Sequence, residues 1–287
     1  SGADIDFDAS ETGGRARLAM ADGALVFPGV FEQPSIGFDT LAARLEWHVR
    51  AQREGPPAIE LKVDDARFAN PDAQGDVQVT WRTGRKPGFG PGARLPGEID
   101  LSGRIVRARA ERVAAYLPLG VPQSVRRYVE RSVRSGTAEA ATFSVKGDAW
   151  QFPFTGQREG TFRVATRVRD LRFDYVPSVP PGSDEPAWES PWPGFGAVQG
   201  ELVFDRSSMQ LNGVQAQLWG LQLRQVQARV ADLGAAQPLL QIDGEARGPA
   251  SDLLRFVAAS PVGRWIGGGL AELSASGAAD LKLALAI

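Results

Sequence analysis

The chain has 287 residues, of which 43% are hydrophobic and 23% are charged, and its formal net charge is −2. This composition supports one large or two ordinary domains with a sizeable core, and the charge alone indicates neither a nucleic-acid-binding protein nor an acidic tail. Because cysteine is absent, the chain has no disulfide and no zinc–thiolate site. No run of apolar residues approaches the roughly 18 needed for a membrane-spanning helix, and no signal peptide is recognisable.

Most of the chain alternates between apolar and polar residues, which is the period of a β-strand with one dry and one wet face. In the segment 213–233, for example, Val214, Ala216 and Leu218 are separated by glutamines. The other segments with this pattern are 4–8, 15–20, 43–49, 58–63, 76–81, 98–105, 141–147, 161–168, 171–176, 199–204, 209–218, 239–248 and 280–287. Turn signals rich in Gly, Pro, Asn and Asp separate them, so the sequence predicts antiparallel β-structure with hairpin connections.

One long stretch, 109–136, has the spacing of helices instead. Four apolar residues fall on one side of it and Arg126, Arg127, Glu130, Arg131 and Arg134 on the other, whereas Pro118 and Pro122 divide it into two parts. The apolar side consists of Val125, Tyr128, Val129 and Val133. We expect this side to pack on the sheet and the arginines to be exposed.

A second, shorter helix is predicted near 251–260, with Ser251 as its N-cap and Pro261 as its stop. The chain is therefore expected to comprise a first β-segment over 1–108, a helical insert over 109–136 and a second β-segment over 137–287, all within one continuous elongated unit. The stretch 177–196, rich in Pro, Gly and Trp, is expected to be a loop or a linker.

The sequence contains no recognisable catalytic constellation. His48 is the only histidine, it lies on the polar phase of a strand, and the chain has no GxSxG nucleophile motif. Asp4, Asp6 and Asp8 alternate as in a calcium loop, but the required Gly and acid do not follow, which favours a solvated strand face. The glycine-rich stretch 263–269 lacks the Lys-Ser/Thr of a phosphate-binding loop. We therefore predict no enzyme activity, no catalytic residue, no metal site and no cofactor.

Residues 104–134 contain eight arginines and two glutamates. Such a patch is compatible with nucleic-acid binding, with contact to anionic lipid headgroups, or simply with a solvated arginine face. The two tyrosines nearby, Tyr116 and Tyr128, fall on the apolar helix phase, which disfavours nucleic-acid binding.

Residues 116–154 read YLPLGVPQSVRRYVERSVRSGTAEAATFSVKGDAWQFPF, which is Tyr-Leu-Pro, a helix ending in Gly, a strand ending in Gly-Asp, and a Phe-Pro-Phe turn. This order resembles a segment of the AsmA-like envelope proteins of the YhdP type. The resemblance covers nearly the whole chain, and further matching segments are 25–47, 66–75, 160–175 and 259–265. The insert 181–190 departs from the family, which usually has a shorter Trp-Pro connection there.

The resemblance implies a mainly β protein whose long antiparallel sheet curls into an open groove, with the helical insert around 109–135. It also implies a periplasmic protein of Gram-negative bacteria, anchored in the inner membrane by a segment outside this chain, that carries phospholipids between the inner and outer membranes. The implied partners are phospholipid acyl chains, the inner membrane and outer-membrane or periplasmic proteins, with no nucleic acid.

A groove of this kind would be lined, at least in part, by the apolar phase of the strands. The predicted lining residues are Leu45, Trp47, Ile59, Leu61, Val77, Val79, Phe162, Val164, Leu202, Phe204, Val214 and Leu218. Alternation alone is equally compatible with a closed β-sandwich. It therefore also permits a structural or interaction protein of the envelope with a closed core and no ligand. A carbohydrate-active β-sandwich enzyme is disfavoured, because no carboxylate pair stands in a recognisable motif.

Overall fold

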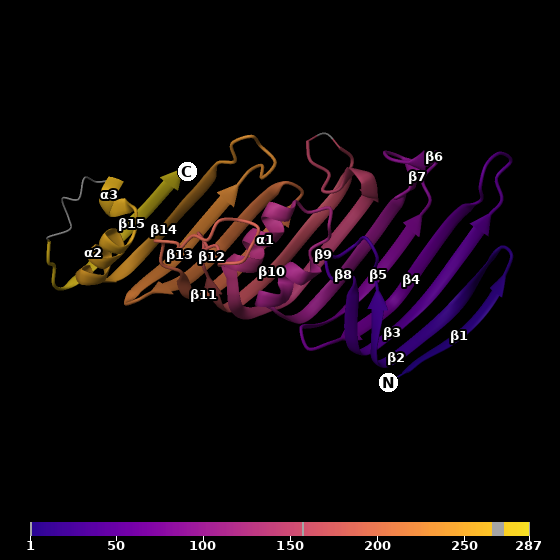
Figure 1. The fold of residues 1–287 in the computed structure, drawn as a ribbon, viewed down its shortest axis with the longest axis horizontal. Coiled ribbons are helices and arrows are strands. Elements are labelled where there is room, and N and C mark those ends of the chain that lie inside the picture. Colours follow the sequence, from indigo (N-terminus) through magenta and orange to yellow (C-terminus); the bar gives the residue numbers. More distant parts are fainter. Residues whose placement is uncertain (1, 157, 266–272, 287) are drawn as a thin grey trace. The chain divides into compact units, whose positions relative to one another are not determined.

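The computed structural model describes residues 2–156, 158–265 and 273–286. It confirms the expected fold class: the protein is mainly β, and thirteen of its strands form one antiparallel sheet (Figure 1). The strand order of this sheet follows the chain, β1-β2-β3-β4-β5-β8-β9-β10-β11-β12-β13-β14-β15, and the first and last strands are not paired with each other. The sheet is therefore open and not closed into a barrel.

The bounds of the elements follow from the backbone. The strands of the large sheet are β1 (Gly2–Ser10), β2 (Gly13–Val26), β3 (Ser35–Arg50), β4 (Ala58–Ala69), β5 (Ala73–Arg82), β8 (Glu98–Arg109), β9 (Val133–Asp148), β10 (Gly160–Phe173), β11 (Phe195–Asp205), β12 (Ser208–Leu218), β13 (Leu221–Val230), β14 (Leu240–Pro249) and β15 (Ala278–Ala286). A separate two-stranded ladder is formed by β6 (Lys86–Phe89) and β7 (Ala93–Leu95). The helical elements are η1 (Ala110–Tyr116), α1 (Gln123–Ser132), η2 (Ala149–Gln151), α2 (Ala250–Ala259) and α3 (Val262–Trp265).

The chain divides into two compact units. Unit 1 comprises Ser1–Ala108, Glu139–Thr166 and Val203–Ser208, and unit 2 comprises Arg109–Ala138, Arg167–Leu202 and Met209–Ile287. Strand β9 begins at Val133, within the range predicted to be a helical insert, because the backbone becomes extended directly after α1. Val133 then packs as a strand residue against the hydrophobic cluster of unit 2.

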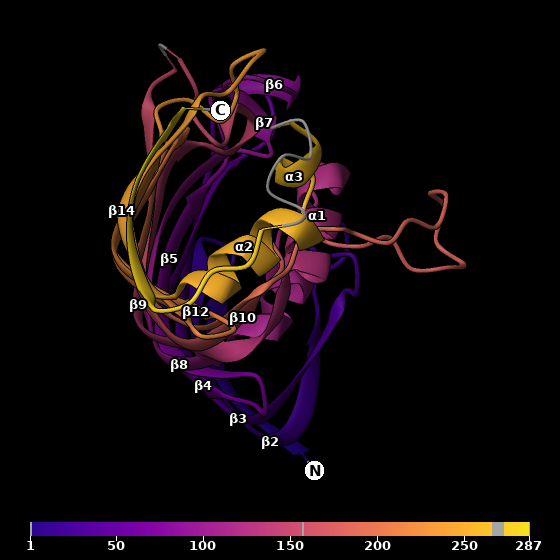
Figure 2. The same cartoon turned by 90° about the vertical axis from the view of Figure 1, so that its left-hand side faces the viewer.

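The core of unit 2 lies on one face of its strands. One hydrophobic cluster in it consists of the buried residues Ala110, Leu171, Val198, Val214 and Ala216, joined by half-buried side chains such as Phe173 and Phe195. Because Ala110 belongs to η1, a helical element covers part of this face. Figure 2 shows α1 and α2 on the side toward which strands β12 and β14 bend.

The prediction for α1 is only partly correct: Val133 packs on the cluster of unit 2 and Val129 is half-buried, as predicted, but other residues of both sides are placed differently. Val125 and Tyr128 are exposed, whereas the side chain of Arg131 is only 14% exposed and that of Arg127 26%. Arg131 Nη1 donates to Glu185 Oε2 over 2.8 Å, and Arg127 donates to both Glu185 and Asp184 over 3.0 and 2.6 Å. The loop between β10 and β11 therefore brings two carboxylates to the arginine side of the helix, a contact across more than 50 residues of sequence that helical periodicity does not reveal.

The second predicted helix is present, but it begins differently. Helix α2 starts at Ala250 after Pro249, and no side chain caps its first turn, so the predicted N-cap role of Ser251 is wrong. Instead, the carboxylate of Asp252 in this first turn accepts a hydrogen bond from the backbone N–H of Gly220 over 3.1 Å. The glycine-rich stretch 263–269 lies outside the described residues from position 266 onward.

An aromatic cluster joins the loop before β11 to the C-terminal helices of unit 2. The ring of Trp192 lies 5.7 Å from that of Tyr175, 6.4 Å from that of Phe256 and 5.6 Å from that of Trp265. Tyr175 is also stacked on Phe195 at 5.1 Å, and burial raises the pKa of its hydroxyl. The loop is thus held at one end by rings and further along by the ion pairs to α1.

The ion pairs between the loop and α1 should respond to pH. Hydrogen bonds from Arg131 and Arg127 hold the pKa of Glu185 below its ordinary value of 4.5. A lowered folded-state pKa stabilises the folded arrangement above the unfolded pKa, and this contribution is lost as the pH falls through the folded value. We expect the amides of Val179 and Trp188, which bond to each other's carbonyls across the loop, to lose protection from hydrogen exchange below pH 4.5.

In Glu185→Gln, the same amides should be less protected at neutral pH, with little further change on acidification. Equal protection in the two proteins over the whole pH range would contradict a role for this ion pair in holding the loop.

Candidate functional site

The register of six strands of unit 1 places their apolar side chains on the same face of the sheet. Along one row across the sheet, Ala16 pairs with Leu45, Leu45 with Val63, Val63 with Val79 and Val79 with Leu101. The next row runs through Trp47, Leu61, Trp81 and Ile99. We call this surface the apolar face of unit 1, and its larger members are Ile5, Phe7, Leu18, Leu45, Trp47, Ile59, Leu61, Val63, Val77, Val79, Trp81, Ile99 and Leu101.

A bulge in β4 keeps this face apolar. The register shifts between Val63 and Ala66, and Asp65 has a left-handed φ of 51°. One extra residue is thereby accommodated, so that Val63 and Ala66 both stay on the apolar face although they are three positions apart. The pair Asp64-Asp65, which as a sequence suggests the end of a strand, is therefore an irregularity inside a longer one.

Aromatic rings lie along the apolar face and do not stand away from it. A Cβ added at Gly14 would lie 2.4 Å from the ring of Trp47, and one added at Gly103 would lie 2.4 Å from the ring of Phe143. These two glycines therefore make room for rings from neighbouring strands. The result is a continuous apolar surface.

Many side chains on the apolar face of unit 1 are accessible to solvent in the described part of the chain. Ile5 is 61% exposed and Phe7 69%, while Leu45, Trp47 and their neighbours along the rows are only half-buried. Among the described residues, all three α-helices belong to unit 2. A sheet that is apolar on one face normally buries that face against a second layer. Across these strands, the described residues of unit 1 leave apolar side chains accessible to solvent.

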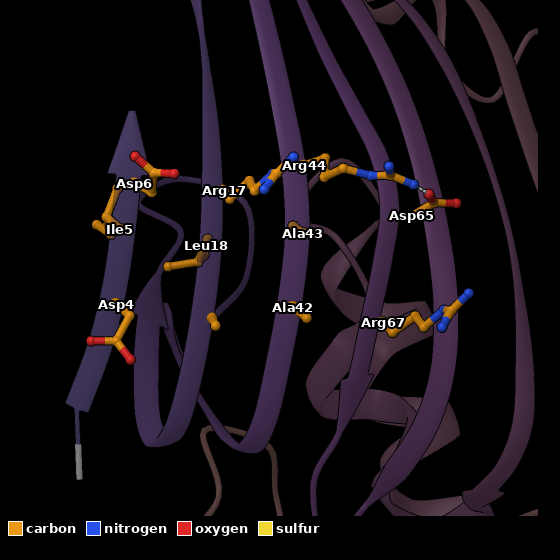
Figure 3. Close-up of a pocket in the computed structure, with 11 residues that line it drawn as sticks. Asp4, Ile5, Asp6, Arg17, Leu18, Ala42, Ala43, Arg44, Asp65 and Arg67 are labelled. Carbon is orange, nitrogen blue, oxygen red and sulfur yellow. Dashed lines mark ion pairs between the residues drawn. The ribbon is translucent and has the colours of Figure 1, made fainter. Parts of the chain in front are cut away.

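The opposite face of the same strands is charged. Figure 3 shows Arg17, Arg44 and Asp65 on β2, β3 and β4, with an ion pair between Arg44 and Asp65, while Ile5 and Leu18 lie on the other side of their strands. A shallow hollow is present here because Ala19 and Ala42 are short. Its lining combines charged side chains such as Arg17 and Arg44 with short or apolar residues of the same strands.

The structure brings six of the predicted lining residues together on the apolar face of unit 1, and all six are half-buried: Leu45, Trp47, Ile59, Leu61, Val77 and Val79. Phe162, Val164 and Phe204 are also half-buried and belong to unit 1, and the ring of Phe162 lies 5.1 Å from that of Phe152. Leu202, Val214 and Leu218 belong to unit 2. Of these, Val214 and Leu218 are buried, and Val214 is part of the hydrophobic cluster.

The sequence-based set omitted several members of the face. Ile5, Phe7 and Trp81 lie in segments whose alternation was recognised, and Ile99 and Leu101 lie in a third such segment. The signal for all five was therefore present in the period of two, and the register assigns them to the same surface.

The polar residues considered for catalysis or metal binding do not converge. His48 Nε2 is 3.4 Å from Glu46 Oε1 on a half-buried part of β3. Asp4, Asp6 and Asp8 are exposed on the polar side of β1, which confirms the solvated strand face. Within the ranges that the structure describes, no group of three or more His, Cys, Asp or Glu side chains is placed to hold a metal ion.

Comparison with known proteins gives one match. The family model described as YhdP protein matches residues 1–287. No curated protein and no solved structure matches the chain significantly. The described helices include none that combines the length and the apolar character needed to cross a membrane.

Two substitutions distinguish the open face from the closed core. Val214→Asp places a carboxylate in the buried cluster of unit 2, which costs several kcal/mol and is comparable to a domain stability of about 5–15 kcal/mol. Val79→Asp places it on the uncovered face of unit 1, where water can reach it. We therefore expect chemical denaturation to show a large loss of stability for Val214→Asp and a loss of about 1 kcal/mol for Val79→Asp. Similar large losses at both positions would indicate that the face of unit 1 is closed.

Proposed function

Because the chain belongs to the YhdP family, an AsmA-like family of the cell envelope, we propose that it is a segment of a protein that carries phospholipids through the envelope. In this proposal the acyl chains lie on the apolar face of unit 1. The observation that carries it is the solvent exposure of Ile5 and Phe7 and the partial exposure of the adjacent rows. Family membership and the open antiparallel sheet support the same reading.

The energetics favour a lipid as the missing layer. Each methylene group removed from water contributes about 0.8 kcal/mol, so an acyl chain of about 16 carbons gains on the order of 10 kcal/mol on the face. The protein side chains gain as well, because the lipid covers their exposed apolar surface. Neither partner then leaves a large hydrocarbon surface in water.

The uniformity of the face suits movement of lipids along it. The rows that contain Leu45 and Trp47 are built from aliphatic and aromatic side chains throughout. No member of these rows is charged, so no position holds an acyl chain much more strongly than the next. A lipid can therefore shift from strand to strand across small barriers, and no covalent chemistry is required.

The finer parts of the proposal concern the whole protein. We propose that the segment belongs to a periplasmic bridge, anchored in the inner membrane, through which phospholipids pass between the inner and outer membranes. The alternative, a structural protein with a closed core, is favoured for part of unit 2 by the cluster around Val214 and Ala110. The lipid path proposed here therefore rests on unit 1.

Copurified phospholipid tests the proposal directly. We expect the protein purified from a Gram-negative host to carry phospholipid detectable by native mass spectrometry. Val79→Asp should remain folded and lose most of this lipid, because a carboxylate on the face is desolvated when an acyl chain covers it. Gln78→Asp adds the same charge at the next residue of β5, on the exposed polar face, and should retain the wild-type amount.

Two outcomes would contradict the proposal. One is a wild-type protein that carries no phospholipid. The other is a folded Val79→Asp protein that carries as much as Gln78→Asp, since that would place the lipid elsewhere.

A further inference from the structure

The two ends of the strands in unit 1 differ in charge. Because successive strands are antiparallel, the connections 11–12, 51–57 and 83–97 lie at one edge of the apolar face, and the connections 27–34 and 70–72 lie at the other. We call residues 50–57 and 83–97 the basic rim. Figure 1 shows β6 and β7, which belong to this rim, near the upper ends of the strands of unit 1.

The basic rim is rich in cations. It contains Arg50, Arg53, Arg85, Lys86 and Arg94 and one acid, Glu54, and the third connection at this edge, 11–12, adds Glu11. The connections at the opposite edge contain Glu32 and Asp72 and no Lys or Arg. Arg50, Arg53, Arg85 and Lys86 are exposed, and across the described part of the chain none of these four forms an ion pair. Their charge is therefore available to an external anion.

Hydrogen bonds hold the rim in a defined conformation. Arg94 Nη1 donates to the Pro56 carbonyl over 3.3 Å and joins the two connections. Within 83–97, the Lys86 N–H donates to the Gly92 carbonyl over 3.0 Å. The Gly92 N–H donates in turn to Asp148 Oδ2 over 2.6 Å. Arg85 and Lys86 are therefore carried on a braced loop.

Apolar surface is also present at this rim. Phe89, at the end of β6, is 71% exposed, and its ring lies edge-on to that of Trp150 at 5.0 Å. Exposed rings and cations within one short segment suit the boundary between acyl chains and a charged headgroup, where an apolar group and a phosphate lie close together.

We propose that the basic rim binds the phosphate of lipid headgroups, so that unit 1 prefers net-anionic phospholipids over zwitterionic ones with the same acyl chains. This inference rests on the proposed function, because it requires acyl chains on the apolar face. The headgroup must then stay in water at an edge of that face. Arginine and lysine at one edge attract its phosphate.

The preference for net-anionic lipids follows from the positively charged group that a zwitterionic headgroup carries beside its phosphate. Its ammonium lies within a few bonds of the phosphate, so the cations of the rim that attract the phosphate repel the ammonium. An anionic glycerol headgroup has no such group and adds hydroxyls that hydrogen-bond with water. The discrimination is electrostatic, and it should weaken as salt shortens the screening length to about 3 Å near 1 M.

A competition experiment tests this inference. The full chain is incubated with vesicles of equimolar phosphatidylglycerol and phosphatidylethanolamine that have identical acyl chains, and the bound lipids are identified by native mass spectrometry. We expect a several-fold excess of bound phosphatidylglycerol. In Arg85→Glu/Lys86→Glu the ratio should fall toward one, while the total amount of bound lipid stays nearly unchanged. The control Arg17→Glu/Arg67→Glu makes the same charge change on the polar face of unit 1 and should keep the wild-type ratio.

Other outcomes of this experiment would contradict either the headgroup inference or the proposed function. A wild-type ratio near one, or an equal fall in the control, would overturn the role of the basic rim and leave the proposed function standing. Absence of both lipids from the wild-type protein would overturn the proposed function itself. If the rim variant reduced flotation with phosphatidylglycerol vesicles while the bound-lipid ratio stayed high, the rim would contact a bilayer surface, and the headgroup inference would be wrong.

Discussion

An apolar sheet face is unfavourable in water, and the described residues of unit 1 leave much of theirs accessible to solvent. Its six N-terminal strand segments direct side chains such as Leu45, Leu61 and Val79 to one side, and the register aligns them in rows. Hydrophobic burial is the main favourable term in folding, so a sheet with one uncovered face is stabilised by what its neighbouring side chains bury and by any ligand that binds. The proposed lipid binding rests on this exposed apolar surface.

The two units differ in how far their apolar faces are covered. In unit 2, Ala110 of η1 and half-buried rings such as Phe173 and Phe195 complete a cluster around Val214. The charged loop that pairs Glu185 with Arg127 and Arg131 adds a further contact to α1. In unit 1 no α-helix of the described chain takes a comparable place. The same strand pattern thus gives a filled face in one unit and an open one in the other.

This difference explains how much the sequence could predict. Alternation with a period of two identifies the strands and the face of each residue, because successive side chains point to opposite sides of a sheet. It therefore grouped Leu45, Trp47 and Val79, although their role as lining residues remains a prediction. Alternation does not say which part of a face is covered, because covering depends on contacts between distant segments. Val214 and Leu45 have the same pattern, and only the cluster with Ala110 distinguishes the buried one. The ion pairs of α1 could not be predicted either, because they also join distant segments of the chain.

Lipid photo-crosslinking from defined positions tests the central claim most directly. A photoreactive side chain at Leu61 points onto the apolar face, whereas one at Lys62 points to the polar side of the same strand. Irradiation in cells followed by mass spectrometry should give adducts with the mass of phospholipid at position 61 and none at position 62. Absence of adducts at position 61, or equal yields at the two positions, would contradict a lipid-carrying face in unit 1.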